Sequence, residues 1–358
     1  CGLVEQMASD EIMLCMTGDP FWAEHCEEVA FNTYPAAVMP DFKALRYITC
    51  PNHTVSDSEN HHPGIDNSGP FLAMNPFSSR CCQHNHAQGW PYYSEHLILA
   101  TPDNGAAIAL YAACKATLKV ADGQEITLHE QTNYPFEEKI SFTVNTTEDV
   151  RFPFYLRIPS WCDQPELAIN GKQKEIDPIP GKYIYIDRTW TDGDKVELNL
   201  PMKLSIRTWQ VNKNSVSVNY GPLTLSLKIN EEYIQKDSPA IYDSRWQEGA
   251  DATQWPSYEI FPKSPWNYAL VLDSKVPLKN FKVIRKEWPS DNFPFTVSNV
   301  PLEVKAIGKQ IPSWTLDKYG LCSELPETNA PKGDREEITL IPMGAARLRV
   351  SAFPNTYE

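Results

Sequence analysis

The hydrophobic pattern of the chain changes its period near Gly105, and this change constrains the fold more than any other feature. Before it, apolar residues recur with helical spacing. After it, most of the chain consists of short apolar or alternating runs separated by Asn, Asp, Gly and Pro. Short strands separated by turn residues are typical of β-sandwiches. The runs are 126–130, 140–144, 154–158, 183–187, 196–200, 216–218, 223–227, 268–272, 281–283, 302–305, 338–342 and 347–352.

Three helices are predicted before the change of period. Asp19, an N-cap residue, is followed by Pro20 at a favoured first helical position, so a second helix begins there and the first ends just before it. A third helix is expected over about 82–100. The stretch 39–80 is rich in Gly, Pro, Asn and Ser but also carries aromatic residues, which favours an ordered, functional loop.

The composition narrows the class of partner. The 358 residues predict about two or three domains. Lys and Arg number 32 against 46 Asp and Glu, and the net charge of −14 argues against binding to a nucleic-acid backbone. An acidic surface is compatible with a neutral substrate such as a sugar. No apolar run approaches the roughly 20 residues of a membrane helix, so no membrane span is expected.

Two adjacent cysteines, Cys81 and Cys82, stand at the start of the third predicted helix. The free N–H groups and the positive end of a helix favour thiolate, the nucleophilic and metal-binding form of cysteine. His84 and His86 follow closely and are potential ligands or proton carriers. Because free cysteines are often buried, the same residues are equally consistent with a packing pair beside surface histidines.

The chain resembles glycoside hydrolase family 127, the β-L-arabinofuranosidase-like proteins, at motifs spread over nearly its whole length. The motifs are Thr17-Gly18-Asp19, Cys81-Cys82-x-x-Asn85, Thr132-Asn133-Tyr134-Pro135, Leu156-Arg157-Ile158-Pro159-Ser160-Trp161, Trp190-Thr191-Asp192-Gly193-Asp194, Gly221-Pro222-Leu223 and Leu340-Ile341-Pro342.

The resemblance implies a multidomain α + β fold. Residues 1–105 would be the C-terminal helices of an (α/α)6 barrel catalytic domain. Residues 106–208 together with 334–356 would form a first β-sandwich, and 209–333 a second, inserted β-sandwich. The chain opens inside a helical pattern without Met, so further sequence is expected upstream.

The resemblance also implies a retaining glycosidase with a zinc-bound cysteine nucleophile. Cys81 matches the nucleophile, which is also a zinc ligand, and Cys82 and Cys1 match two further ligands. A glutamate ligand two residues before Cys1, and a general acid/base glutamate further upstream, would lie outside this chain. The expected substrate is a β-L-arabinofuranoside of a plant-type glycan, and this fragment alone is expected to be inactive.

Gln83 and His84 stand where the family commonly has two prolines, which indicates a divergent subgroup. His84 and Tyr47 are candidates for substrate contact. Helix capping or packing for His84, and a core position for Tyr47, are equally consistent with the sequence. Glu5 lies one helical turn after Cys1 and is a candidate extra ligand or acid, against an ordinary exposed helix position.

A second hypothesis is a non-catalytic carbohydrate-binding protein in which the cysteines and zinc are a relic or are structural. In either case the expected partner is an oligo- or polysaccharide. The resemblance to bacterial polysaccharide-degrading enzymes favours the periplasm, with the cytoplasm as the alternative. The sequence does not predict an oligomeric state.

Overall fold

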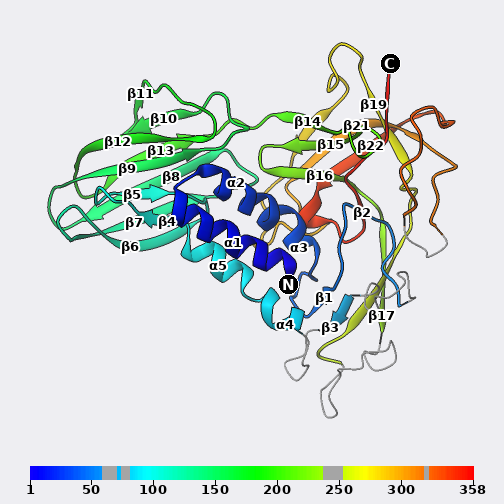
Figure 1. The fold of residues 1–358 in the computed structure, drawn as a ribbon, viewed down its shortest axis with the longest axis horizontal. Helices are drawn as coiled ribbons and strands as arrows, with labels where there is room; N and C mark the ends of the chain where they lie inside the picture. Colours follow the sequence, from blue (N-terminus) through cyan, green and yellow to red (C-terminus); the bar gives the residue numbers. More distant parts are fainter. Residues whose placement is uncertain (59–70, 74–80, 237–252, 318–321) are drawn as a thin grey trace. The chain divides into compact units, whose positions relative to one another are not determined.

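The computed structural model describes residues 1–58, 71–73, 81–236, 253–317 and 322–358 (Figure 1). The chain is predominantly β and divides into two compact units. Unit 1 comprises Cys1, 31–86 and 204–358, and unit 2 comprises 2–30 and 87–203. The predicted division into 1–105, 106–208 with 334–356, and 209–333 stays a prediction. Among the described helices, none is long and apolar enough to cross a bilayer.

The helices of unit 2 are α1 (Gly2–Thr17), α2 (Pro20–Glu28) and α5 (Gly89–Glu95). Helix α1 is terminated by the next residue, Gly18, which adopts a φ of +66° and donates its N–H to the carbonyl of Leu14 at 2.8 Å. Glycine reaches this left-handed conformation without a steric cost. Asp19 then caps α2 by accepting the N–H of Phe21 at 3.0 Å. The predicted boundary between the first two helices is therefore confirmed.

Unit 2 contains two sheets whose buried faces meet (Figure 1). Phe142 on β8 and Phe154 on β9 touch edge to face, with ring centroids 5.7 Å apart. The six-stranded sheet, in the order β11-β10-β13-β8-β7-β6, is formed by β6 (Cys114–Val120), β7 (Gln124–Thr132), β8 (Lys139–Thr146), β10 (Glu166–Ile169), β11 (Lys172–Lys174) and β13 (Asp194–Asn199). The four-stranded sheet, in the order β12-β9-β5-β4, is formed by β4 (Ile98–Ala100), β5 (Ala106–Ile108), β9 (Val150–Ile158) and β12 (Lys182–Trp190).

Unit 1 is built around an eight-stranded sheet in the order β14-β15-β16-β22-β21-β19-β24, with β20 also paired to β21. A four-stranded sheet has the order β1-β3-β18-β17, and β2 pairs with β23. The strands are β1 (Ala44–Arg46), β2 (Asn52–His53), β3 (Phe71–Ala73), β14 (Leu204–Trp209), β15 (Ser215–Tyr220), β16 (Leu223–Leu227), β17 (Glu231–Lys236), β18 (Ser257–Pro262), β19 (Tyr268–Leu272), β20 (Lys282–Arg285), β21 (Leu302–Gln310), β22 (Arg335–Pro342), β23 (Arg349–Val350) and β24 (Asn355–Tyr357).

The single helix predicted over 82–100 is wrong. The structure has α4 (Cys81–His86), a break, α5, and then strand β4. Pro91 explains the break, because proline lacks an N–H and belongs in the first turn of a helix, where it stands in α5. Residues 98–100 pair with β5 instead of extending the helix.

The second predicted helix is also subdivided. Helix α2 is followed by a π-helical turn, η1 (Val29–Thr33), and by the short helix α3 (Tyr34–Ala36). A 3-10 turn, η2 (Met343–Ala345), lies beside α3 within unit 1. Of the stretch predicted as a long functional loop, the described part contributes β1, β2 and β3, and 59–70 and 74–80 lie outside the described residues.

Candidate metal centre

The two adjacent cysteines open helix α4 in unit 1. The side-chain amide of Asn85 donates to the carbonyl of Cys81 at 2.9 Å, one turn back. Cys82 is 3% exposed and packs against Val38 and Leu45, and Cys1 packs against the same cluster. The apolar contacts of Cys82 therefore fix the start of α4 and leave its neighbour at the surface.

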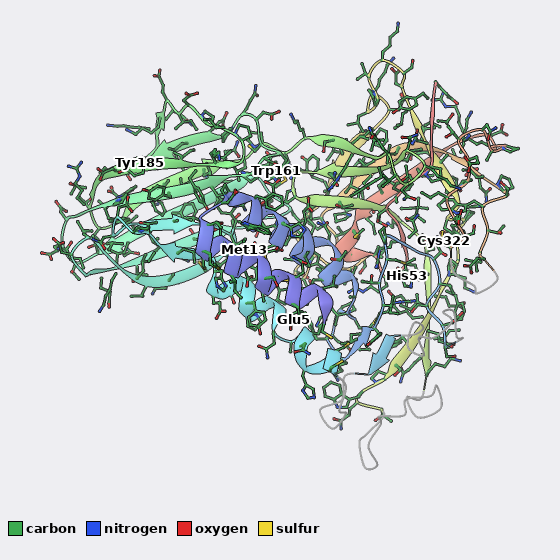
Figure 2. The ribbon with its side chains drawn as sticks, viewed as in Figure 1. Glu5, Met13, His53, Trp161, Tyr185 and Cys322 are labelled. Carbon is green, nitrogen blue, oxygen red and sulfur yellow. The ribbon has the colours of Figure 1, made fainter. Side chains whose placement is uncertain are left out.

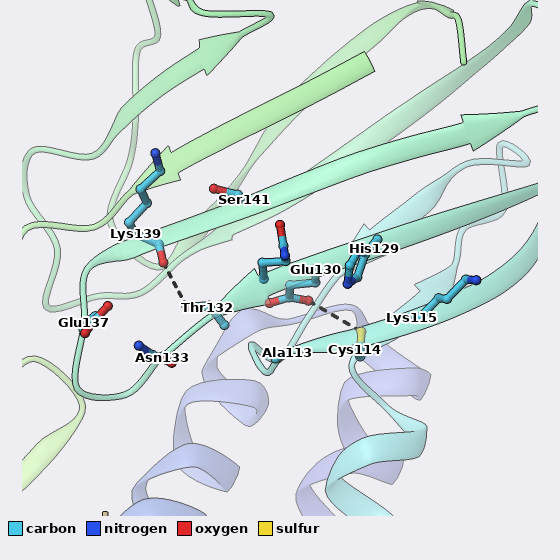
Figure 3. A pocket seen from close by; sticks show the side chains of 11 residues that line it. Ala113, Cys114, Lys115, His129, Glu130, Thr132, Asn133, Glu137, Lys139 and Ser141 are labelled. Carbon is cyan, nitrogen blue, oxygen red and sulfur yellow. Dashed lines mark hydrogen bonds between the residues drawn. The ribbon is translucent and has the colours of Figure 1, made fainter. Parts of the chain in front are cut away.

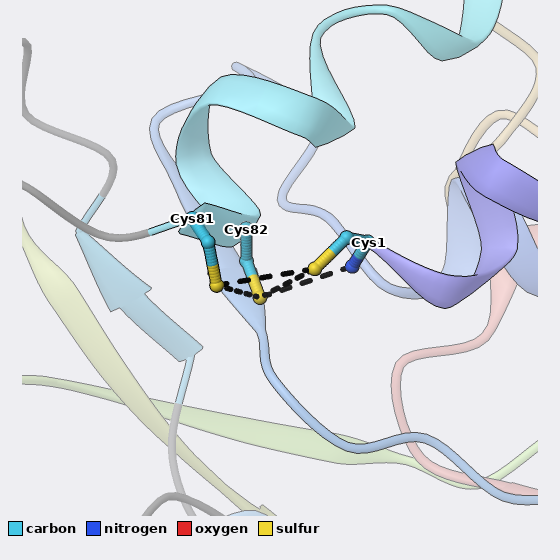
Figure 4. A group of neighbouring side chains, drawn as sticks. All are labelled: Cys1, Cys81 and Cys82. Atoms are coloured by element: carbon cyan, nitrogen blue, oxygen red, sulfur yellow. Dashed lines mark hydrogen bonds between the residues drawn. The ribbon is translucent and has the colours of Figure 1, made fainter.

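The structure brings Cys1 to this pair, although 80 residues separate it from Cys81 (Figure 4). The Sγ of Cys1 lies 4.0 Å from that of Cys81 and 3.5 Å from that of Cys82. The Sγ atoms of Cys81 and Cys82 are 3.9 Å apart. All nine cysteines lie within the described residues, and none forms a disulfide.

These sulfur spacings fit a tetrahedral zinc ion. Zinc–thiolate bonds of about 2.3 Å at tetrahedral angles place two sulfur atoms about 3.8 Å apart. The three distances of 3.5, 3.9 and 4.0 Å lie around that value. The three thiols offer three of the four ligands of such an ion.

The three thiols differ in their access to solvent. Cys81 is exposed, Cys1 is partly exposed and Cys82 is buried. Burial raises the pKa of the Cys82 thiol above its ordinary value. Helix α4 has only six residues, so the helix-end effect expected from the sequence is small, and burial outweighs it at Cys82. A bound cation would reverse this preference and hold the thiol deprotonated.

His86 supports the helix that carries the cysteines. Its ring stacks on Tyr34 with centroids 4.4 Å apart, and the Tyr34 hydroxyl donates to the His86 carbonyl at 2.6 Å. Burial lowers the pKa of His86 to about 4, so the imidazole is neutral at physiological pH. This contact ties the end of α4 to α3.

The remaining candidates from the sequence do not join the three thiols. Among the described residues, the group able to hold a metal consists of Cys1, Cys81 and Cys82 alone. His84 is exposed on α4, and Tyr47 is 43% exposed just after β1. Glu5 is exposed on α1, in unit 2 (Figure 2). Their proposed roles in substrate contact or acid chemistry stay predictions.

The sequence did not single out Glu130, which lines a shallow cavity of about 600 Å³ on β6, β7 and β8 of unit 2 (Figure 3). The Glu130 side chain is buried, and its carboxylate accepts a hydrogen bond from the Cys114 thiol at 3.9 Å. Burial raises the pKa of Glu130 well above its ordinary value. Alternation along β7 places Ile126, Leu128 and Glu130 on the core face, which is the one signal that marks this carboxyl as buried.

Two family models match the chain. The model described as "Beta-L-arabinofuranosidase, GH127 catalytic domain" matches residues 1–95. The model described as "Beta-L-arabinofuranosidase, GH127 middle domain" matches residues 105–202. No curated protein sequence matches the chain.

Solved structures share its fold. A protein described as a glycoside hydrolase is 20% identical, with a TM-score of 0.70, and the match covers 99% of this chain and 52% of that one. A GH127 β-L-arabinofuranosidase from Geobacillus stearothermophilus T6 is 19% identical, with a TM-score of 0.66, over 99% of this chain and 49% of that one. A further GH127 β-arabinofuranosidase matches with the same identity, coverage and TM-score. The chain thus spans about half the length of these structures.

Proposed function

Because the chain belongs to glycoside hydrolase family 127, we propose that it is part of a retaining glycosidase that acts on β-L-arabinofuranosides of plant-type glycans. The observation that carries this proposal is the group of three thiols, spaced as zinc ligands are spaced, with one member exposed. The two GH127 structures described as arabinofuranosidases support the choice of sugar.

Cys1, Cys81 and Cys82 would hold a zinc ion in this proposal. Zinc would keep the coordinating thiols deprotonated, and so would supply a thiolate at neutral pH. The resemblance to the family predicts a glutamate as the remaining ligand. Without a cation, burial favours the protonated thiol at Cys82.

Cys81 is the nucleophile in this proposal, because it is the exposed member of the group. Its thiolate would attack the anomeric carbon and displace the leaving oxygen, which takes a proton from a general acid. The resulting glycosyl–cysteine thioether would then be hydrolysed by water. Two displacements at one carbon retain its configuration. Cys82 is buried and would hold the metal without meeting the sugar.

The finer architecture belongs to the same proposal. Residues 1–105 would complete an (α/α)6 barrel, and the sheets that follow would form two β-sandwich modules. The protein would act on an oligo- or polysaccharide in a bacterial periplasm.

Sugar release by the full-length protein tests this function. The substrates are aryl β-L-arabinofuranosides with aryl pyranosides beside them, and the variant is Cys81→Ser. Cys50→Ser is the matched control, because Cys50 is another exposed cysteine of unit 1. We expect L-arabinose from the parent and from Cys50→Ser, and none above background from Cys81→Ser.

Full activity in Cys81→Ser would rule out Cys81 as the nucleophile. If neither the parent nor either variant released any sugar while a glycan still bound to the protein, the hypothesis of a non-catalytic carbohydrate-binding protein would replace that of a hydrolase. The zinc content of the protein and the effect of chelation would then distinguish a structural cysteine site from a relic. A structural site would contain zinc, and removal of that zinc would unfold the region that it holds.

A further inference from the structure

A groove lies on the outer face of the four-stranded sheet of unit 2, away from the face that packs in the core. Side chains alternate along β9, so Phe152 and Phe154 are buried between the sheets while Tyr155 points to the opposite face. The groove has a volume of about 680 Å³. This volume is within the range of small-ligand sites, roughly 300–1,000 Å³.

The register of the sheet explains why a hollow forms at this place. Leu99, Ala107, Tyr155 and Tyr185 are successive partners across β4, β5, β9 and β12. Paired residues share a face, so these four side chains form a row across the sheet. Ala107 contributes only a methyl group between larger neighbours, which leaves the space that the groove occupies.

Two segments form the walls of the groove. On one side is the last turn of α1, where Leu14 is buried and Met16 is 75% exposed. On the other side is the turn from Thr101 to Asp103, between β4 and β5. Every residue that lines the groove belongs to unit 2.

Tyr155 and Tyr183 line the groove, and Tyr185, which neighbours Tyr155 on the same face of the sheet, extends their aromatic surface. The rings of Tyr155 and Tyr185 have centroids 5.0 Å apart and are inclined at 57°, and Tyr183 lies 6.5 Å from Tyr155. Tyr185 is 56% exposed (Figure 2). A large side chain this exposed, next to a hollow, presents an apolar face to whatever enters.

A carboxylate at the rim is held in a fixed orientation. The Tyr155 hydroxyl donates to Oδ2 of Asp103 at 2.6 Å, and the Thr101 hydroxyl donates to Oδ1. These hydrogen bonds lower the pKa of Asp103, and the bond to Asp103 raises the pKa of Tyr155 to about 12. At neutral pH the rim therefore carries an ionised acceptor beside a protonated phenol.

We propose that this groove, which Tyr155, Tyr183 and Asp103 line and which Tyr185 flanks beside Tyr155, is a non-catalytic binding site for a neutral oligosaccharide. A sugar ring has an apolar face that packs on aromatic rings and a rim of hydroxyls that donate to a fixed carboxylate. The negative charge of Asp103 disfavours acidic glycans, because it would repel their carboxylates. The site shares no residue with the cysteine group and does not depend on hydrolysis.

Calorimetric titration of the full-length protein tests the site, in a Cys81→Ser background that leaves the glycan intact. The probes are soluble arabinan, which is neutral, and polygalacturonate, which is acidic. The variants are Tyr185→Ala and Tyr155→Phe, the second of which removes only a hydroxyl. Tyr357→Ala is the matched control, because Tyr357 in unit 1 has the same exposed fraction, 56%.

We expect arabinan to bind the parent and Tyr357→Ala alike, about tenfold more weakly to Tyr185→Ala, and more weakly to Tyr155→Phe. Equal affinity in the parent and Tyr185→Ala, an equal loss in Tyr357→Ala, no binding of arabinan, or a preference for polygalacturonate would each overturn the proposal. Tyr185→Ala with Cys81 intact should hydrolyse a small aryl glycoside as fast as the parent does. A failure of the binding-site proposal can therefore be told apart from a failure of the hydrolase proposal.

Discussion

The guanidinium of Arg157 on β9 donates to the carboxylate of Glu27 on α2, and both side chains are buried. The Tyr134 hydroxyl donates to the other carboxylate oxygen at 2.8 Å. Burial lowers the pKa of Arg157, but the Glu27 carboxylate and nearby phenols outweigh it, and the pKa stays well above its ordinary value. Strand β9, in which the motif 156–161 begins, is thus joined to a helix more than a hundred residues earlier by an ion pair that water does not screen.

Breaking this pair should destabilise unit 2. Glu27→Gln leaves a buried guanidinium without its counter-charge, and we expect the free energy of unfolding to fall by about 3–5 kcal/mol. Urea denaturation followed by tryptophan fluorescence measures this change. Asp187→Asn is the control, because it removes the charge from the exposed pair with Arg151 in the same sheet, where solvent screens the interaction, and should destabilise the protein far less. Equal losses in the two variants would contradict the buried-pair account.

Glu11 on α1 should make stability depend on pH. Burial raises its pKa from 4.5 to about 8, and its neighbours are the Cys26 thiol at 3.5 Å and Nδ1 of His96 at 3.2 Å. The folded state favours the protonated acid, so the unfolded state loses its proton first as the pH rises. The contribution of Glu11 to stability is therefore greatest below pH 4.5 and falls between pH 4.5 and about 8.

The variant Glu11→Gln removes this titration. We expect it to be more stable than the parent at pH 8, by up to about 4 kcal/mol, and to lose most of that advantage at pH 4.5. Urea unfolding at the two pH values measures the difference. Glu5→Gln is the control on the same helix, because Glu5 is exposed. If both variants had the same pH profile as the parent, Glu11 would not be the titrating group.

Gly105 directly precedes strand β5, and the structure shows why glycine stands there. A Cβ at this position would lie 2.2 Å from the carbonyl oxygen of Pro153, on the neighbouring strand. We expect Gly105→Ala to destabilise the protein by about 3 kcal/mol, as a drop in the thermal unfolding midpoint. Gly2→Ala is the control, because nothing lies within 4 Å of its Cβ. An unchanged midpoint in Gly105→Ala would mean that β5 can shift away from β9.

Much of the strand pattern could be predicted from the sequence, because alternation is local. The run 140–144 lies within β8, where Ile140, Phe142 and Val144 all face the core. The short strands β10 and β11 were missed, because three or four residues carry too little alternation. The break between α4 and α5 could have been anticipated from Pro91, since proline in a helix interior removes a hydrogen bond.

The sites depend on contacts that no local pattern contains. Cys81 and Cys82 are adjacent, but Cys1 reaches them only through the folded chain, and its place in the group came from the family resemblance. Likewise Tyr155 meets Asp103 across 52 residues, through the pairing of β5 with β9. Strand order and register decide such contacts, and a single sequence does not specify them.

Zinc binding should depend on the buried member of the cysteine group. Cys82→Ser replaces a thiolate ligand with a hydroxyl that binds zinc weakly, so we expect the purified full-length variant to lose its zinc, measured by mass spectrometry of the metal. Cys322→Ser is the control, because Cys322 lies in the same unit but outside the group and should leave the zinc content unchanged. Chelation should then lower the unfolding midpoint of the parent and of Cys322→Ser but not of Cys82→Ser, because a metal that binds only the folded state stabilises it. An unchanged zinc content in Cys82→Ser would contradict the assignment of Cys82 as a ligand. Its sulfur, 3.5 Å from that of Cys1 and 3.9 Å from that of Cys81, would then not be needed to hold the ion.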